Sequence, residues 1–189
     1  MKKSIVISFA TIVVLSIVIC IKWQHISTKF FPCCKTCTSS EEKNPVIEKL
    51  TIAFADEWVA AYQYWMGAKF THGLISNEVS KELEQHYKEE MEHANMIAAR
   101  IIQLGGAFHM FPKDWHNIGA CTFDAISDYS FPTVLRENLK GEHCAVAFYQ
   151  DLLKMVEGKD QETYNIIQKI LNDELEHVKD LTDLLKKLE

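Results

Sequence analysis

Two short motifs in this sequence have the residue types and the spacing that bind metal ions. Glu90 and His93 form one Glu-x-x-His motif, and Glu174 and His177 form a second. On a helix, residues three apart lie on one face, so each motif offers a carboxylate and an imidazole to the same ion. This mixed ligation favours iron or manganese over zinc, which often takes thiolates, and over calcium, which takes oxygen ligands. Iron is the expected metal, with manganese as the alternative.

Two single glutamates complete a repeated pattern. Glu57 precedes the first motif by 33 residues and Glu142 precedes the second by 32. All four glutamates fall in the middle of heptad stripes that are mainly apolar apart from the two histidines, and burying four unpartnered carboxylates would cost many kcal/mol. Two divalent cations would balance the four charges. We expect a centre of two ions per subunit with six ligands: Glu57, Glu90, His93, Glu142, Glu174 and His177.

Four long amphipathic segments must position these ligands. Asn44-Pro45 and Asp160 are typical of helix starts, and glycines follow the first three segments. The expected helices cover about residues 45–72, 77–104, 131–158 and 160–188. The links within the first and second pairs are short, whereas residues 105–131 are long enough to cross the bundle. These lengths predict an all-α fold, a ferritin-like antiparallel four-helix bundle with one long crossover.

Composition separates a basic head from an acidic body. The 189 residues allow one domain of ordinary size, and 7 Gly and 4 Pro argue against a turn-rich β fold or a disordered chain. Residues 1–45 carry six Lys and two Glu, whereas residues 46–189 have a net charge of −10. No nucleic-acid partner is expected, and the acidic body would attract cations.

The first 22 residues are predicted to be a membrane anchor or signal segment. An uncharged run over residues 4–21 is just long enough for an N-terminal hydrophobic helix that reaches across a bilayer, and it lacks an Ala-x-Ala cleavage pattern. An uncleaved anchor is therefore favoured over an exported, cleaved form, and basic residues on both sides leave the membrane side open. Residues 23–45 form a linker with three cysteines of undefined role: Cys33, Cys34 and Cys37. Residues 46–189 form the helical domain.

The helical domain resembles the ferritin-like di-iron superfamily. The stretches Glu57-Trp-Val-Ala-Ala-Tyr-Gln-Tyr64 and Glu90-Met-Glu-His-Ala94 are similar to bacterioferritin motifs. The segments around Cys121 and Cys144 look like those of the Dps-like, or thioferritin, branch. That resemblance implies a bacterioferritin-type di-iron site, a dodecameric shell and a redox-active pair of these two cysteines.

Bacterioferritin also has a haem ligand at the position of Met91. Methionine in a bundle usually serves packing, and the cysteine pair favours the haem-free branch, so no haem is expected. Tyr64 lies seven residues after Glu57, where it is either a hydrogen-bonding or radical-quenching group of the site or a core residue. His86, four residues before Glu90, is either a neighbour of the site or a surface or packing residue. Four further acids are assigned to a solvated face: Glu84, Glu89, Glu92 and Asp151.

The pattern and the resemblance together predict a ferroxidase. Fe(II) would be oxidised by hydrogen peroxide or dioxygen for iron storage and protection from oxidative stress. Three alternatives remain: a membrane-tethered di-metal enzyme without storage, catalase-like or oxygenase-like; a haem-containing bacterioferritin; and a structural bundle whose acids bind metal only for stability.

Overall fold

The computed structural model describes residues 44–71, 76–107, 111–121, 126 and 128–187. Its regular elements are helices, which confirms the predicted all-α bundle. The long helices are α2 (Pro45–Phe70), α3 (Ser76–Gln103), α5 (Phe131–Val156) and α6 (Gln161–Lys186). The predicted hydrophobic segment and the cysteine linker up to residue 43 lie outside the described residues.

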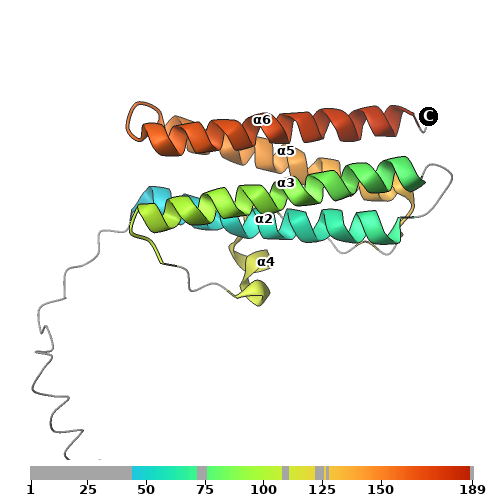
Figure 1. Cartoon of the computed structure of the whole chain (residues 1–189), viewed down its shortest axis with the longest axis horizontal. Helices are drawn as coiled ribbons and strands as arrows, with labels where there is room; N and C mark the ends of the chain where they lie inside the picture. The colour runs from blue at the N-terminus through green and yellow to red at the C-terminus, as the bar shows by residue number, and fades with distance from the viewer. Residues whose placement is uncertain (1–43, 72–75, 108–110, 122–125, 127, 188–189) are drawn as a thin grey trace, which may run out of the picture. The chain divides into compact units, whose positions relative to one another are not determined.

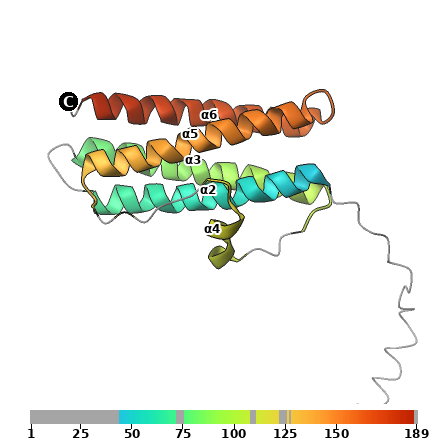
Figure 2. The same cartoon turned by 180° about the vertical axis from the view of Figure 1, so that it is seen from behind.

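The four long helices form two antiparallel hairpins that pack on each other. In Figure 1 and, from behind, in Figure 2, α2 pairs with α3 and α5 pairs with α6. Further contacts join α2 to α5 and α3 to α6. Every helix therefore has two neighbours, and the centre of the bundle is reached by one face of each helix.

Helix ends follow local capping signals in the sequence. The Asn44 side chain accepts a hydrogen bond from the backbone N–H of Val46 at 3.0 Å, and Asp160 caps α6 through the N–H of Thr163. Gly158 follows the end of α5 with φ +70°, a conformation that favours glycine. The observed helices end two residues or fewer before the expected positions, because the last residues of each pattern belong to caps and turns.

The crossover contains two short helices that the sequence patterns did not predict. They are η1 (Pro112–Asp114) and α4 (Trp115–Ile118), and α4 packs against α2. The indole of Trp115 stacks on that of Trp58 with ring centroids 4.9 Å apart. This stacking attaches the crossover to the outside of α2.

Two apolar clusters occupy the bundle on either side of its middle. One is built around Leu50, Ile97 and Ile167, and the other around Leu83, Leu135 and Leu181. Each fully buried Leu or Ile side chain contributes about 1.5–3 kcal/mol relative to exposure. These clusters stabilise the helices, so the layer between them can be polar. No helix in the described part of the chain combines the length and apolar content needed to cross a bilayer.

Candidate metal centre

The layer between the apolar clusters holds all six predicted ligands, and every one is buried. Each of the four long helices contributes a glutamate, and α3 and α6 each add a histidine. The exposed fractions are 3% for Glu57, 1% for Glu90, 1% for His93, 3% for Glu142, 1% for Glu174 and 2% for His177. The heptad spacing thus placed each glutamate on the interior face of its helix.

The six side chains divide into two sets that share two glutamates. Glu57 and His93 belong to one set, Glu142 and His177 to the other, and both sets include Glu90 and Glu174. Within each set the ligand atoms lie within 4.8 Å of one another. The arrangement fits two ions, each with one terminal glutamate and one histidine, joined by two bridging carboxylates.

Each histidine directs the same ring nitrogen, Nδ1, into the centre. Nδ1 of His93 lies 3.3 Å from carboxylate oxygens of both Glu90 and Glu174. Nδ1 of His177 lies 3.2 Å from Glu90 and 3.3 Å from Glu174. The equivalent distances reflect an approximate two-fold symmetry that relates the two hairpins.

Several polar atoms of the centre are buried and form no hydrogen bond, although charged neighbours lie 3.2–3.3 Å away. They are Oε1 of Glu90, both carboxylate oxygens of Glu174 and Nδ1 of His177. A buried polar group without a partner is costly, and a native fold keeps one only for a reason. Metal ions would supply the missing partners, because carboxylate oxygens and imidazole nitrogens are ligands for iron and manganese. The donor set therefore fits two such ions.

The opposite nitrogen of each histidine contacts a second, outer carboxylate. Nε2 of His93 lies 3.1 Å from Asp173, and Nε2 of His177 lies 3.0 Å from Glu89. An outer carboxylate that accepts from a ligand histidine fixes its tautomer and ring orientation. The assignment of Glu89 to a solvated face alone was therefore wrong. The sequence position of the two outer carboxylates indicates this role, because Glu89 and Asp173 each directly precede a glutamate that both ligand sets share.

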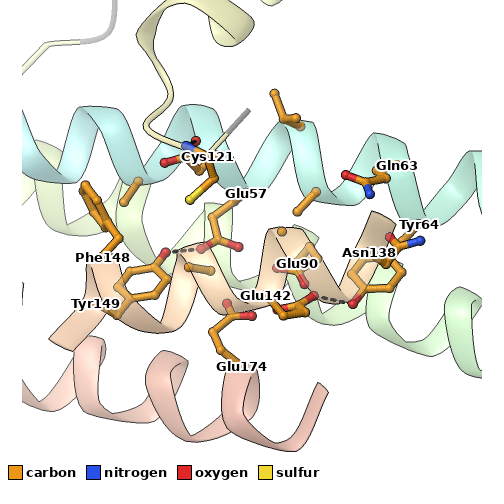
Figure 3. A pocket seen from close by; sticks show the side chains of 16 residues that line it. Glu57, Gln63, Tyr64, Glu90, Cys121, Asn138, Glu142, Phe148, Tyr149 and Glu174 are labelled. Carbon is orange, nitrogen blue, oxygen red and sulfur yellow. Dashed lines mark hydrogen bonds between the residues drawn. The ribbon is translucent and has the colours of Figure 1, made fainter. Parts of the chain in front are cut away.

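Two tyrosines hold the terminal glutamates from the far hairpin. The hydroxyl of Tyr64 donates to Glu142, and that of Tyr149 donates to Glu57, as Figure 3 shows. Tyr64 therefore bonds not the glutamate on its own helix but its counterpart across the bundle. Tyr149 was not among the site residues expected from the sequence. The seven-residue spacing from Glu57 to Tyr64 recurs from Glu142 to Tyr149, and this repeat could have identified Tyr149 as the counterpart of Tyr64.

In the metal-free protein, the histidines are held in their charged form. Burial disfavours a charged ring, but contacts with Glu174, Glu57 and Glu90 raise the pKa of His93 well above its usual value. Likewise, Glu142 and Glu174 outweigh burial and raise the pKa of His177. Burial, together with the negative charges of Glu90 and Glu174, raises the pKa of Glu57 and of Glu142.

Metal binding is therefore expected to release protons. Imidazole binds a metal through a neutral nitrogen, so the raised pKa values of His93 and His177 mean that an ion entering near pH 7 displaces their protons. Apparent affinity for Zn²⁺ should then rise with pH over the range in which these groups are protonated. Isothermal titration in buffers of different ionisation enthalpy would measure the protons released. A titration without proton release would contradict this protonation state.

Removing an outer carboxylate should weaken metal binding without removing a ligand. The changes Glu89→Gln and Asp173→Asn each replace the acceptor for Nε2 of one ligand histidine. Losses of this kind typically cost about 10–100-fold in metal affinity. Competition with a chromogenic chelator would measure the effect, with the exposed Glu92→Gln as the control on α3. Equal affinity in all three variants would count against a positioning role.

The structure joins Cys121 of the crossover to Cys144 of α5 by a disulfide, with Cα atoms 5.7 Å apart. The Asp56 carboxylate on α2 accepts hydrogen bonds from the backbone N–H groups of Ala120 and Cys121 at 3.0 and 2.9 Å. Because Asp56 and Glu57 are neighbours on α2, the same turn of helix binds the crossover and lines the centre. Cys121 and Glu57 also line one cavity, shown in Figure 3.

Two other candidate residues lie outside the six-ligand set. His86 is 1% exposed and stacks on the ring of His177, with centroids 4.0 Å apart. Met91 is half-buried on the outer side of α3, where it lines a hollow with Trp58 and Trp65. The structure thus places His86 beside the centre and Met91 away from it.

Comparison with known proteins agrees with this geometry. The family model described as "Ferritin-like domain" matches residues 47–189. This chain belongs to the ferritin-like family. It is 28% identical to the "DNA protection during starvation protein" of Pyrococcus furiosus over 134 residues, covering 70% of this chain and 72% of the relative. It is 30% identical to the bacterioferritin of Rhodobacter capsulatus over 134 residues, covering 70% and 78%.

Solved structures of ferritin-like proteins superpose on the bundle. The dodecameric thioferritin from Bacteroides fragilis, described as bacterioferritin-related, has a TM-score of 0.74 and 38% identity over 76% of this chain and 86% of that one. Dps from Thermosynechococcus elongatus has a TM-score of 0.71 at 16% identity, covering 75% and 90%, and is similar in fold. These matches confirm the resemblance to the Dps-like and bacterioferritin proteins of the ferritin-like family.

Proposed function

We propose that this protein is a ferroxidase that binds two Fe(II) ions per subunit and oxidises them for storage. The observation that carries the proposal is the pair of ligand sets that share Glu90 and Glu174, because three of the four buried carboxylate oxygens of these two residues form no hydrogen bond. A structural bundle would gain more from leucine at these positions. The iron here is the substrate, and the six side chains form its binding site.

Each group of residues has a distinct role in the proposed reaction. Glu90 and Glu174 hold the two ions close together, while His93 and His177 complete one ligand set each. The tyrosine hydroxyls orient the terminal glutamates. Two Fe(II) ions give up one electron each, and one hydrogen peroxide takes both electrons and two protons to form two waters. Dioxygen is the other candidate oxidant.

The cysteine pair belongs to this proposal as a redox-active neighbour of the centre. The disulfide lies on the α2–α5 side, and Cys121 lines the same cavity as Glu57 and Glu142. Two thiols yield two electrons and two protons when they form a disulfide, which matches the demand of one hydrogen peroxide.

Storage requires a hollow assembly, and we propose a homo-oligomeric shell. The thioferritin from Bacteroides fragilis is described as dodecameric and shares 38% identity with this chain, which supports a dodecamer here. Attachment to a membrane through residues 4–21 is the other part of the proposal, and it rests on the sequence alone. Separation of membrane and soluble fractions from cells that express the full chain would test it.

One experiment tests the function directly. Purified full-length protein is mixed anaerobically with two Fe(II) per subunit and then with hydrogen peroxide or air, and Fe(III) formation is followed by absorbance. Oxidation faster than in protein-free buffer, followed by retention of iron with the protein on size-exclusion chromatography, would support a storage ferroxidase. Oxidation with no retained iron and no large assembly would favour the di-metal enzyme without storage.

A further inference from the structure

A second cluster of ligand-type side chains lies next to the dinuclear centre. It consists of Glu82 and His86 on α3 and Asp180 on α6. His86 comes four residues before Glu90, and Asp180 comes three residues after His177. The cluster therefore lies about one helical turn along the bundle from the two ligand motifs, and none of its members belongs to the six-ligand set.

His86 is the buried member, and its ring is not engaged in a hydrogen bond through Nδ1. The residue is 1% exposed, and Nδ1 has no hydrogen-bond partner. Nε2 points toward the two acids, lying 3.5 Å from Glu82 and 3.9 Å from Asp180. The ring thus directs one nitrogen at both carboxylates, and imidazole is a common metal ligand through either nitrogen.

The two acids stand close enough to favour a cation between them. Ligand atoms of the three residues lie within 4.8 Å of one another. Burial and the nearby Asp180 and Glu89 raise the pKa of Glu82, as expected for carboxylates held together. Lys179 contacts Oδ1 of Asp180 from the solvent side, which leaves Oδ2 facing His86. Side-chain exposures of 31% for Glu82 and 27% for Asp180 keep the cluster open to ions in solution.

We propose that Glu82, His86 and Asp180 form a third, mononuclear site for a divalent cation. The His86 ring stacks on His177, and Glu89, which accepts from His177, also lies within reach of His86. An ion at the third site is therefore one side-chain layer away from the dinuclear centre, on the α3–α6 side opposite the disulfide. The identification of its ion as Fe(II) moving to or from the centre rests on the proposed function. The existence of the cation site does not depend on that function.

Zinc titration of the full-length protein tests this site independently of oxidation. We expect three Zn²⁺ per subunit in the unmodified protein and two in the double variant Glu82→Gln/Asp180→Asn. The matched control, Glu92→Gln/Asp183→Asn, removes one acid outside the cluster from each of the same two helices and should still bind three; Glu92 is exposed, and the Asp183 side chain is 49% exposed. Three equivalents in both variants, or two in the unmodified protein, would overturn the third site.

Anomalous scattering at the zinc edge from crystals of the unmodified protein would locate the ions. A third peak within bonding distance of His86 is expected, and a third peak elsewhere would contradict the assignment. Two peaks among the six ligands with none at His86 would leave the proposed function intact and remove this inference. Fewer than two ions among the six ligands would instead count against the proposed dinuclear centre.

Discussion

Replacing Glu90 with alanine is expected to lower the rate of rapid Fe(II) oxidation by more than about 100-fold. Glu90 is shared by both ligand sets, so its loss removes one ligand from each ion and the bridge between them. Changes to outer-sphere carboxylates already cost about 10–100-fold in metal affinity, and loss of a shared ligand should exceed that range. Stopped-flow absorbance after mixing with Fe(II) and hydrogen peroxide would measure the rate.

Glu92→Ala is the control, because Glu92 lies two residues further along α3 and is exposed. It removes the same type of side chain from the same helix without touching the centre. If Glu90→Ala oxidised Fe(II) as fast as Glu92→Ala, the assignment of the centre would be wrong.

The same substitution should leave the metal-free protein folded. Four buried glutamates repel one another in the absence of metal, and replacing one relieves part of that repulsion. It also removes a buried charge that His93 and His177 partly neutralise, and the two effects oppose each other. Circular dichroism should therefore show an unchanged helical content and a melting temperature that does not fall steeply, so lost oxidation would reflect lost metal binding.

The fold and the six ligands followed from sequence because both depend on periodicity. Heptad spacing determines which side of a helix a residue occupies, and a glutamate such as Glu142, which follows Leu135 and Leu139 on one stripe, is visible as a charge on an apolar stripe. The lengths of the links then determined the order of the helices. Helix faces and link lengths can be recognised without knowledge of any side-chain contact.

Contacts between helices were harder to predict, because they depend on register and not on periodicity alone. Tyr149 bonds Glu57 across the bundle, 92 residues away, and Asp173 reaches His93 from α6. No feature of the sequence indicates that Asp56 binds the crossover, because its hydrogen-bond partners are backbone N–H groups. Its close approach needs Gly119, where an added Cβ would lie 2.3 Å from Oδ1 of Asp56.

Reduction of the Cys121–Cys144 disulfide is expected to lower the free energy of unfolding by about 3 kcal/mol. The bond closes a loop across a sequence separation of 23 residues, and the chain-entropy model gives roughly this value for such a loop. The crossover would then be held by the Trp58–Trp115 stacking and by the hydrogen bonds from Ala120 and Cys121 to Asp56. Urea denaturation with and without dithiothreitol, at equal protein concentration, would measure the difference.

The double variant Cys121→Ser/Cys144→Ser is the necessary control, because the chain has four other cysteines that a reductant would also affect. Its stability should match that of the reduced protein and should not respond to dithiothreitol. Hydrogen exchange gives a local measurement, since the amides of Ala120 and Cys121 should exchange faster once the bond is broken. If the oxidised protein, the reduced protein and the double variant unfolded at the same urea concentration, the disulfide would not stabilise the crossover, and its place beside Glu57 would have to be explained by redox chemistry alone.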